Sequence, residues 1–572
     1  MNRDATSDFQ LSAFEKMVAS RMVISLNDFS DQPVTELTSD LKQLIQQTEV
    51  AGVILFASNF VSIEQTIKLT HDLQSARAEG ELPLLISTDQ EGGRVTRLPS
   101  DFATTFTGNM AIGATYPSHG VEFAHKVGAA LARELCVLGI NVNFAPTLDA
   151  NTNPDNPVIN VRSFGENSHT VTDLGSAMVE AIQKQGVAAA IKHFPGHGDT
   201  DIDSHTGLPR VDRSLDELIR TDLLPFKEVC KQAQPAMVMT AHIQYPEIDS
   251  TTLTSKNNTS MIVPATMSRQ LLQRILREQL QFDGVIITDA LDMAGVADHF
   301  DPVTAVVETF KAGADIALMP FKDKTKDCVL SFKQFIHEVA KRLSEENLSE
   351  EEMQHSCQRV QQLRVNYSLD ELSLPAKISQ AEAIFADNKH HLLEAYLAAN
   401  AITLLGDESA LPLTKDNSIV IVANDMLQAN LLLDEVASHI AQANHITTRS
   451  WSEVSATDYK DIDTRILLVD YGYHSPVLEK PEAVATDFAS TTQQKIAEFL
   501  ESDGVNIVVA MQSPYDIADY VEQSDAALFC YHGVLSQNKN TFSNSALSAL
   551  AEVLVGEKRA TGTLPVTLKR GD

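Results

Sequence analysis

The stretch Ala188-Ala189-Ala190-Ile191-Lys192-His193-Phe194-Pro195-Gly196-His197-Gly198-Asp199 joins an apolar run to a loop rich in polar residues. A run that is apolar almost throughout is typical of a parallel strand, which is buried on both faces of its sheet. Lys192 and His193 come at the end of this run, so they should lie at the carboxyl end of the strand. In barrels of parallel strands, that end carries the active site.

Similar apolar runs alternate with amphipathic helix patterns from about residue 12 to residue 365. The candidate strands are 52–57, 84–88, 141–145, 188–192, 236–240, 284–288 and 314–319. The helix patterns include 121–138, 171–185, 214–232 and 268–279. These alternations predict an α/β fold, a (β/α)8 TIM-like barrel with one strand still unrecognised. A doubly wound sheet remains the alternative, because the number of strands does not separate the two folds.

A second alternating pattern follows a Glu-, Ser- and Gln-rich region. Its candidate strands are 402–405, 418–423, 466–469, 505–510 and 526–530, with helix patterns at 427–441 and 492–500. This pattern predicts a smaller α/β/α sandwich domain. We therefore divide the chain into a catalytic barrel (1–370), a linker (371–395) and a C-terminal domain (396–572). No glycine-rich phosphate loop follows a strand, so nucleotide binding has little support.

The composition limits the class of partner. Lys and Arg total 44 against 77 Asp and Glu, which gives a net charge of −33. Nucleic acids and anionic membranes are bound through basic patches, so neither is expected as a partner. The first eight residues are polar, and no apolar stretch follows that could serve as a signal peptide or membrane span. These features predict a cytoplasmic protein. The five cysteines form no CxxC pair, so no thiolate metal site is suggested.

Polar residues directly follow several of the candidate strands. They are Asp89, Asp149, Lys192-His193, His242 and Asp289. Because the carboxyl ends of barrel strands share one rim, we expect these side chains to converge. Asp289 is placed on a rigid element, as a nucleophile that attacks an anomeric carbon must be. Its alternative role is to cap the following helix.

The sequence Asp203-Ser204-His205 lies on a loop rich in glycine and aspartate. An aspartate two residues before a histidine can bind the ring and fix its tautomer, which suits the histidine to proton transfer. The alternative is a solvated turn. A metal site formed by His193, His197 and His205 is a rival interpretation. The spacing argues against it, because Pro195 and Gly196 interrupt any helix that could present the first two as a pair.

A further set of charged residues suits the recognition of sugar hydroxyl groups. A carboxylate accepts hydrogen bonds from hydroxyls, and cationic side chains donate to their oxygens. The residues are Asp89, Arg97, Arg162 and Lys192. Taken singly, each arginine could instead form a surface ion pair.

Together these residues resemble glycoside hydrolase family 3, in particular its NagZ-type β-N-acetylglucosaminidases in their two-domain form. The matching segments are Asp89-Gln90-Glu91-Gly92-Gly93-Arg94-Val95, Asn143-Phe144-Ala145-Pro146-Thr147-Leu148-Asp149, Arg162-Ser163-Phe164-Gly165, Lys192 to Asp199, Asp203-Ser204-His205 and Thr288-Asp289-Ala290-Leu291-Asp292-Met293. They occur in the family's order and spacing. One departure is Asn160-Val161 before Arg162, where the family often has a glycine.

The resemblance implies a retaining mechanism through a covalent glycosyl-enzyme. Asp289 would be the nucleophile, and His205, oriented by Asp203, the general acid/base. Asp89, Arg97, Arg162, Lys192 and His193 would bind the sugar, and no cofactor or metal is implied. Terminal GlcNAc of peptidoglycan (murein) fragments, in cytoplasmic recycling, is the expected substrate. A family 3 enzyme of other sugar specificity, or a β-N-acetylglucosaminide phosphorylase, is the alternative.

Overall fold

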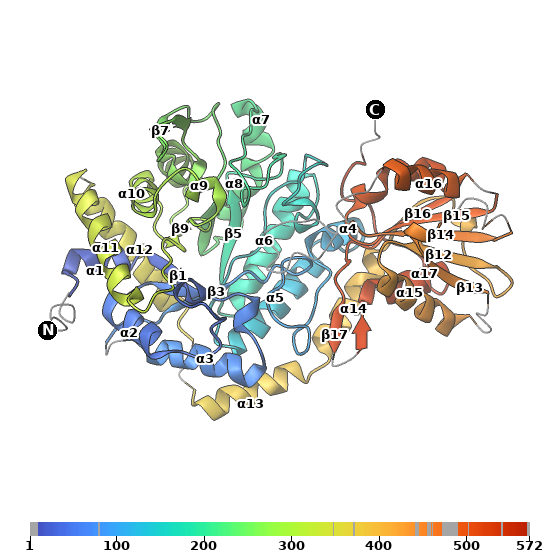
Figure 1. Ribbon diagram of the computed structural model, residues 1–572, viewed down its shortest axis with the longest axis horizontal. Coiled ribbons are helices and arrows are strands. Elements are labelled where there is room, and N and C mark those ends of the chain that lie inside the picture. The colour runs from blue at the N-terminus through green and yellow to red at the C-terminus, as the bar shows by residue number, and fades with distance from the viewer. Residues whose placement is uncertain are drawn as a thin grey trace.

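The computed structural model describes residues 10–77, 80–346, 348–369, 372–440, 445–454, 459, 461–471, 490–501, 503–538 and 541–568. The chain forms two domains that lie side by side, a larger N-terminal one and a smaller C-terminal one (Figure 1).

The larger domain is built on a ring of parallel strands. They are β1 (Met22–Ser25), β2 (Gly52–Ile54), β3 (Leu85–Thr88), β4 (Val142–Asn143), β5 (Ala188–Phe194), β6 (Met237–Thr240), β9 (Val285–Ile287) and β10 (Ala317–Leu318). Each strand pairs with the next along the chain, and β10 pairs with β1. A bridge between Ile287 and Ile316 joins β9 to the segment leading into β10. The predicted barrel is confirmed, and the doubly wound sheet is excluded because the strand order never reverses.

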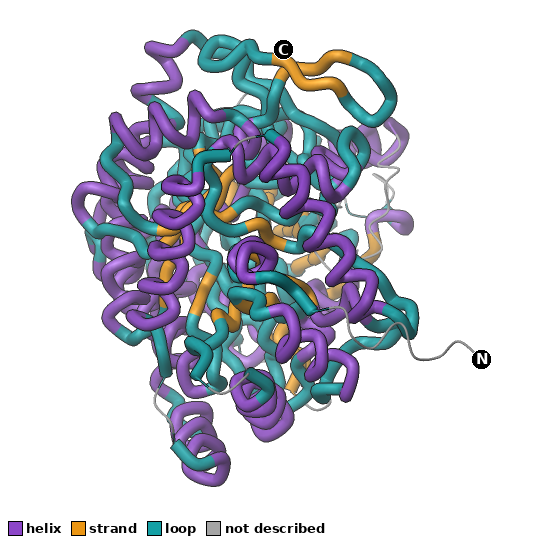
Figure 2. Tube along the Cα trace, turned by 90° about the vertical axis from the view of Figure 1, so that its left-hand side faces the viewer, coloured by secondary structure: helices purple, strands orange, loops and turns teal. Residues whose placement is uncertain are grey.

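Helices surround this ring (Figure 2). They are α1 (Ala13–Ala19), α2 (Ser39–Thr48), α3 (Ile63–Ser75), α4 (Asn109–His119), α5 (Glu122–Val137), α6 (Ser168–Lys184), α7 (Leu215–Arg220), α8 (Leu223–Gln232), the π-helical segment η5 (Gln270–Gln279), α9 (Ala294–Ala297), α10 (Pro302–Ala312), α11 (Cys328–Glu345) and α12 (Glu350–Asn366). A short hairpin of β7 (Thr252–Thr254) and β8 (Ser260–Ile262) extends from the barrel.

Helix α6 shows how the sequence forms these elements. Asn167 precedes it, and its side chain accepts hydrogen bonds from the backbone N–H groups of His169 and Thr170, which fixes the start of the helix. The buried side chains include Val171, Leu174, Met178 and Ile182, a spacing of three or four residues that gives one apolar face. This face packs against α5 and the barrel strands.

Two barrel elements differ from the sequence-based expectation. The unrecognised strand is β1, which begins three residues after the last residue of α1, so its apolar run continues the helix pattern before it. The helix expected over 214–232 is two helices, α7 and α8. They are separated at Thr221 and Asp222, where the buried Asp222 carboxylate accepts a hydrogen bond from Arg213 (3.1 Å).

The smaller domain has a six-stranded sheet in the order β11-β16-β15-β14-β12-β13. The strands are β11 (Thr403–Gly406), β12 (Ile419–Ala423), β13 (Ile446–Ser450), β14 (Thr464–Val469), β15 (Val505–Ala510) and β16 (Ala526–Phe529), all parallel except β11. The helices α15 (Met426–His439) and α17 (Ser545–Leu554) cover one face, and α16 (Ser490–Leu500) and the 3-10 segment η8 (Pro514–Gln523) cover the other. A hairpin of β17 (Ser536–Asn538) and β18 (Thr541–Ser543) completes it.

This arrangement is the predicted three-layer sandwich. Successive residues of β12 alternate between the two apolar cores, Ile419 and Ile421 in one, Val420 and Val422 in the other. Strand β13 was not recognised in the sequence. It lies at the edge of the sheet, where Thr447 and Arg449 are exposed and interrupt the apolar pattern.

Two helices connect the domains, α13 (Leu374–Phe385) and α14 (Lys389–Ala401). Helix α13 packs on the barrel helices α3 and α5, whereas α14 lies between α4 of the barrel and α17 of the smaller domain (Figure 1). The residue limits of the linker stay a prediction. Among the described residues, no helix has the length and apolar character needed to cross a membrane.

Helix α14 carries a buried carboxylate into the contact with the barrel. Both oxygens of Glu394 accept hydrogen bonds from Thr107, from its backbone N–H (2.9 Å) and its hydroxyl (2.9 Å). Burial raises the pKa of Glu394 to about 7, which these hydrogen bonds only partly offset. The protonated form therefore predominates in the folded protein below that pH.

We predict that Glu394→Gln removes one pH-dependent contribution to stability. In the unfolded chain this carboxyl ionises near its ordinary value, so the wild-type protein loses stability as the pH rises from about 4.5 through 7. The Glu394→Gln variant keeps a neutral side chain at this position. The melting temperature of the variant minus that of the wild type should therefore increase as the pH rises from about 5 to 8. Thermal unfolding followed by circular dichroism across this range measures the difference, and a constant difference would contradict the assignment.

Candidate active site

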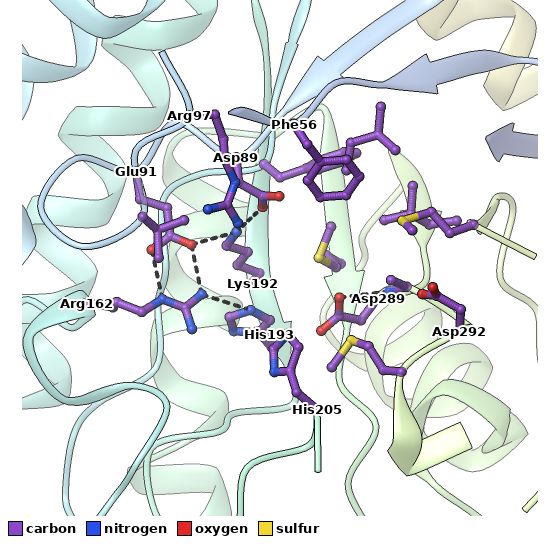
Figure 3. A pocket seen from close by; sticks show the side chains of 18 residues that line it. Phe56, Asp89, Glu91, Arg97, Arg162, Lys192, His193, His205, Asp289 and Asp292 are labelled. Carbon is purple, nitrogen blue, oxygen red and sulfur yellow. Dashed lines mark hydrogen bonds and ion pairs between the residues drawn. The ribbon is translucent and has the colours of Figure 1, made fainter. Parts of the chain in front are cut away.

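One pocket opens at the carboxyl ends of the barrel strands (Figure 3). It encloses about 770 Å³ when the space of its open mouth is included. Its polar lining residues are Asp89, Glu91, Arg97, Arg162, Lys192, His193, His205, Asp289 and Asp292. The apolar lining residues are Ile54, Phe56, Val95, Phe144, Met239, Ala290, Met293, Leu318 and Met319.

The wall drawn on the left of Figure 3 is a network of ion pairs centred on Glu91. Arg162 donates to both oxygens of Glu91, from Nε (3.0 Å) and from Nη2 (2.8 Å). The Nζ of Lys192 lies 2.7 Å from Oε1 of Glu91 and 2.7 Å from Oδ1 of Asp89. Arg97 lies beside Asp89.

Because Glu91 and Lys192 are buried, the pKa of each depends on the charges of its neighbours. Glu91 and Lys192 are each 2% exposed. Burial alone would raise the pKa of Glu91, but the charges of Arg162 and Lys192 outweigh it and lower that pKa. Burial would lower the pKa of Lys192, and Asp89 and Glu91 reverse the shift and raise it. Glu91, Arg162 and Lys192 are therefore ionised at neutral pH, and the network presents Asp89 and cationic donors to the pocket.

Lys192 and His193 both line this pocket although they are consecutive residues of β5. Successive side chains of a regular strand point to opposite faces. The strand is irregular at this point, since its pairing with β6 shifts register between Ile191 and Phe194, and both side chains line the same cavity.

A carboxylate behind the pocket orients His193. Asp149, which is 1% exposed, accepts a hydrogen bond from His193 Nδ1 (2.7 Å) and others from the backbone N–H groups of His193 (3.1 Å) and His197 (2.7 Å). Because the ionised carboxylate can only accept, Nδ1 carries the proton. The Nε2 atom then faces Arg162, whose Nη2 is 3.4 Å away.

His197 does not reach the pocket. Its Nδ1 lies 2.7 Å from the hydroxyl of Thr200 and its Nε2 lies 3.1 Å from the hydroxyl of Ser204. Burial and the neighbouring His193 lower its pKa to about 4, so the ring is neutral at physiological pH. The three histidines of the rival metal interpretation thus have three separate sets of partners, and His197 holds the turn that carries His205.

Asp289 lies on the other side of the pocket (Figure 3). It follows β9, and its backbone N–H donates to the carbonyl of Thr240 on the neighbouring strand (3.2 Å). Its Oδ1 accepts from the N–H of Ala290 (2.8 Å). Burial would raise the pKa of this carboxyl, but His193, His242 and His205 lower it, so Asp289 is ionised.

His242 was expected on the same rim, and the structure places it behind the pocket instead. It is fully buried, and its Nε2 lies 2.9 Å from the carbonyl of Ala290, the residue after Asp289. Burial lowers the pKa of His242, so its ring is neutral. Its role is to support the turn that carries Asp289.

His205 enters the pocket from the loop after β5. Its Nδ1 lies 2.7 Å from Oδ1 of Asp203, which leaves Nε2 available to the cavity. The carboxylate also accepts from the backbone N–H of His205 (2.8 Å). The carbonyl of Ser204 accepts from the N–H of Gly295 at α9 (3.1 Å), which fixes the turn against the barrel.

The structure brings the sequence-predicted residues together. Asp89, Arg97, Arg162, Lys192, His193, His205 and Asp289 all line the pocket, and Asp203 contacts His205 from behind. Sequence reasoning did not single out Glu91 or Asp292. Glu91 lies two residues after Asp89 in the same motif, and that proximity was the available signal. Asn160 adopts a φ of 42°, a left-handed conformation that glycine adopts readily and that asparagine also tolerates.

A barrel whose rim holds a carboxylate, a carboxylate-bound histidine and a buried network of ion pairs has the residues expected of a glycoside hydrolase. Residues 16–363 match the family model described as the N-terminal domain of glycosyl hydrolase family 3. The chain therefore belongs to glycoside hydrolase family 3.

Individual relatives are similar over much of the chain. The chain is 40% identical over 555 residues to Beta-hexosaminidase A of Pseudoalteromonas piscicida, covering 94% of this chain and 92% of that protein. It is 35% identical over 303 residues to Beta-hexosaminidase of Bordetella avium, covering 52% and 82%. A family 3 beta-N-acetylglucosaminidase from Paenibacillus sp. has a similar structure, with a TM-score of 0.77, 28% identity and coverage of 98% and 100%.

We predict that Asp149→Asn lowers kcat/KM by about 10–100-fold, the usual cost of losing a residue that orients a site histidine. The amide can still accept from the two backbone N–H groups, but its NH2 group cannot accept the Nδ1 proton. His193 would then carry its proton on Nε2, where the N–H group would face the N–H donors of Arg162. Steady-state kinetics test this, with Asp216→Asn, at an exposed aspartate of α7, as a matched control that should retain wild-type activity.

Proposed function

We propose that this glycoside hydrolase is a retaining β-N-acetylglucosaminidase that releases terminal GlcNAc from glycans through a covalent glycosyl-enzyme. The observation that carries the proposal is that Asp289 and the Asp203–His205 pair face one pocket, opposite a network suited to sugar hydroxyls. The names of the similar proteins, beta-hexosaminidase and beta-N-acetylglucosaminidase, support the choice of sugar.

In the first step, the Asp289 carboxylate attacks the anomeric carbon and forms the ester of the glycosyl-enzyme. The glycosidic C–O bond breaks, and His205 donates a proton from Nε2 to the departing oxygen. In the second step, His205 accepts a proton from water, whose oxygen attacks the same carbon and displaces Asp289. The two inversions retain the anomeric configuration, and both residues return to their initial state.

The charges of the pocket suit these roles. The ionised Asp289 is ready to act as nucleophile, and a histidine as acid/base places no second anion beside it. Asp203 accepts a hydrogen bond from Nδ1–H of His205. This bond stabilises the imidazolium form, which must donate a proton from Nε2. Asp89, Arg97, Arg162, Lys192 and His193 bind the hydroxyls of the sugar from the opposite wall.

We also propose peptidoglycan fragments that end in GlcNAc as the natural substrates, with recycling in the cytoplasm. This part of the proposal rests on the resemblance to NagZ-type enzymes. Release of GlcNAc from GlcNAc–anhydromuramic acid, compared with release from chitobiose under the same conditions, measures the preference. A clear preference for chitobiose would contradict the peptidoglycan assignment.

We predict that Asp289→Ala lowers kcat by at least about 1,000-fold while GlcNAc still binds, because the nucleophile is lost but the opposite wall is kept. Turnover of an aryl β-N-acetylglucosaminide and calorimetric titration with GlcNAc measure the two properties. Asp298→Ala, an exposed aspartate shortly after in the chain, is the control and should be active. An unchanged rate in Asp289→Ala would rule out the nucleophile assignment.

We predict that His205→Ala lowers kcat/KM for chitobiose by about 100-fold or more, the contribution expected of a general acid. The loss should be much smaller for an aryl glycoside with an acidic leaving group, which needs little protonation. Equal losses on both substrates would argue against proton transfer by His205. Repeating the assay of the wild-type enzyme with inorganic phosphate tests the alternative, since a phosphorylase would form GlcNAc 1-phosphate.

A further inference from the structure

One segment of the barrel lies between the active site and the smaller domain. We call residues 150–166 the bridge segment. It begins directly after Asp149, which orients His193, and it contains Arg162, which lines the pocket. It contacts both the turn that leads to His205 and the C-terminal domain.

On the active-site side, amide side chains of the bridge segment hold the loop that leads to His205. Asn156 Nδ2 donates to the carbonyl of His197 (2.8 Å), and Asn153 Nδ2 donates to the carbonyl of Thr200 (3.2 Å). The backbone N–H of Asn153 donates to the carbonyl of Gly198 (3.2 Å). The packing is close, since a Cβ atom at Gly198 would lie 1.7 Å from the carbonyl oxygen of Ala150.

On the other side, the bridge segment is bonded to the smaller domain at both of its ends. Near its start, Asn151 Nδ2 donates to the hydroxyl of Tyr515 in η8 (3.1 Å). At its end, the N–H of Glu166 donates to the carbonyl of Pro565 (3.1 Å), and the Glu166 carboxylate accepts from the N–H (2.8 Å) and hydroxyl (2.6 Å) of Thr567. Val161 packs in the apolar core that α4 shares with the smaller domain's sheet.

Asn151 connects these contacts within the bridge segment. Its Oδ1 accepts from the backbone N–H of Asn160 (3.0 Å), two residues before Arg162, and its own N–H donates to the carbonyl of Gly165 (3.0 Å). One buried side chain therefore closes the loop on itself while it contacts Tyr515. Burial raises the pKa of Tyr515 to about 12, so the residue keeps its hydroxyl proton at any pH at which the enzyme works.

We propose that the smaller domain is a working part of the active site, with Tyr515 as a positioning residue that acts through Asn151 and the bridge segment on the loop carrying His205. The inference rests on the proposed acid/base role of His205. Tyr515 does not line the pocket, so its effect is on the placement of that loop, and hence on protonation of the leaving group.

The test compares two substrates in the full-length enzyme. Tyr515→Phe removes only the hydroxyl, and we expect kcat for chitobiose to fall about fivefold, the factor that corresponds to one hydrogen bond. For an aryl glycoside with an acidic leaving group, we expect less than a twofold change, because that substrate needs little proton donation. A pure loss of folded protein would lower both rates equally.

Tyr520→Phe is the matched control. Tyr520 lies in the same segment η8 and is buried, but its hydroxyl pairs with Tyr471 inside the smaller domain. We expect wild-type kinetics on both substrates. Thermal unfolding of the two variants checks that any difference in kinetics does not follow from a difference in stability.

A double-mutant cycle tests whether the effect passes through Asn151. Asn151→Ala should lower the chitobiose rate more than Tyr515→Phe, since it also loses the contact with Asn160. Adding Tyr515→Phe to Asn151→Ala should then cause no further loss. A further fivefold loss in the double variant would show that Tyr515 acts by another route and would overturn the inference.

The outcomes separate this inference from the proposed function. If His205→Ala is sensitive to the leaving group but Tyr515→Phe behaves as wild type, the smaller domain does not position the loop, and the function stands. Equal losses on both substrates in Tyr515→Phe would also overturn the inference, because they would place the effect at sugar binding or stability. If His205→Ala is insensitive to the leaving group, the acid/base role fails and the inference fails with it.

Discussion

The buried carboxylate of Glu91 must be paired, because an isolated charge in the interior costs several kcal/mol or more. Arg162 and Lys192 provide that pairing, and they come from separate parts of the chain, the loop after β4 and the end of β5. The network therefore ties neighbouring strand ends to one another before any substrate is present. Of the residues proposed to bind sugar, it holds Asp89, Arg162 and Lys192 in place.

The opposite wall has a different electrostatic character. Asp289 accepts a hydrogen bond from a backbone N–H, and the histidines around it lower its pKa. Asp203 accepts hydrogen bonds from the ring and from the backbone N–H of His205. The arginines and the lysine that line the pocket lie together on the wall with Glu91, where we propose that sugar hydroxyls bind (Figure 3). In the proposed mechanism, proton transfer is left to His205, an imidazole and not a second carboxylate.

The smaller domain gives these residues a second layer of support. Its sheet packs against α4, and its segments at Tyr515 and Pro565 to Thr567 hold the bridge segment from outside the barrel. A loop on the rim of a barrel can otherwise change its conformation, since strands and helices fix only its two ends. Here the loop is held along its length, and its own amides in turn hold the loop that carries His205.

The sequence by itself determined the two-domain α/β architecture, because buried parallel strands require apolar runs that are visible in a single chain. It also determined which residues follow those runs, and so Asp89, Lys192, His193 and Asp289 could be placed on one rim. Strands β1 and β13 were missed, since β1 follows so soon after α1 that its apolar run continues the helix pattern, and β13 is an exposed edge. Tertiary structure alone decided which residues are partners: Glu91 with Arg162, Asp149 with His193, Asn151 with Tyr515. Such pairings depend on distances between segments far apart in the chain, and no local pattern records them. Lys192 and His193 also line the same cavity at a point where the pairing of β5 with β6 shifts register, which the sequence pattern does not show.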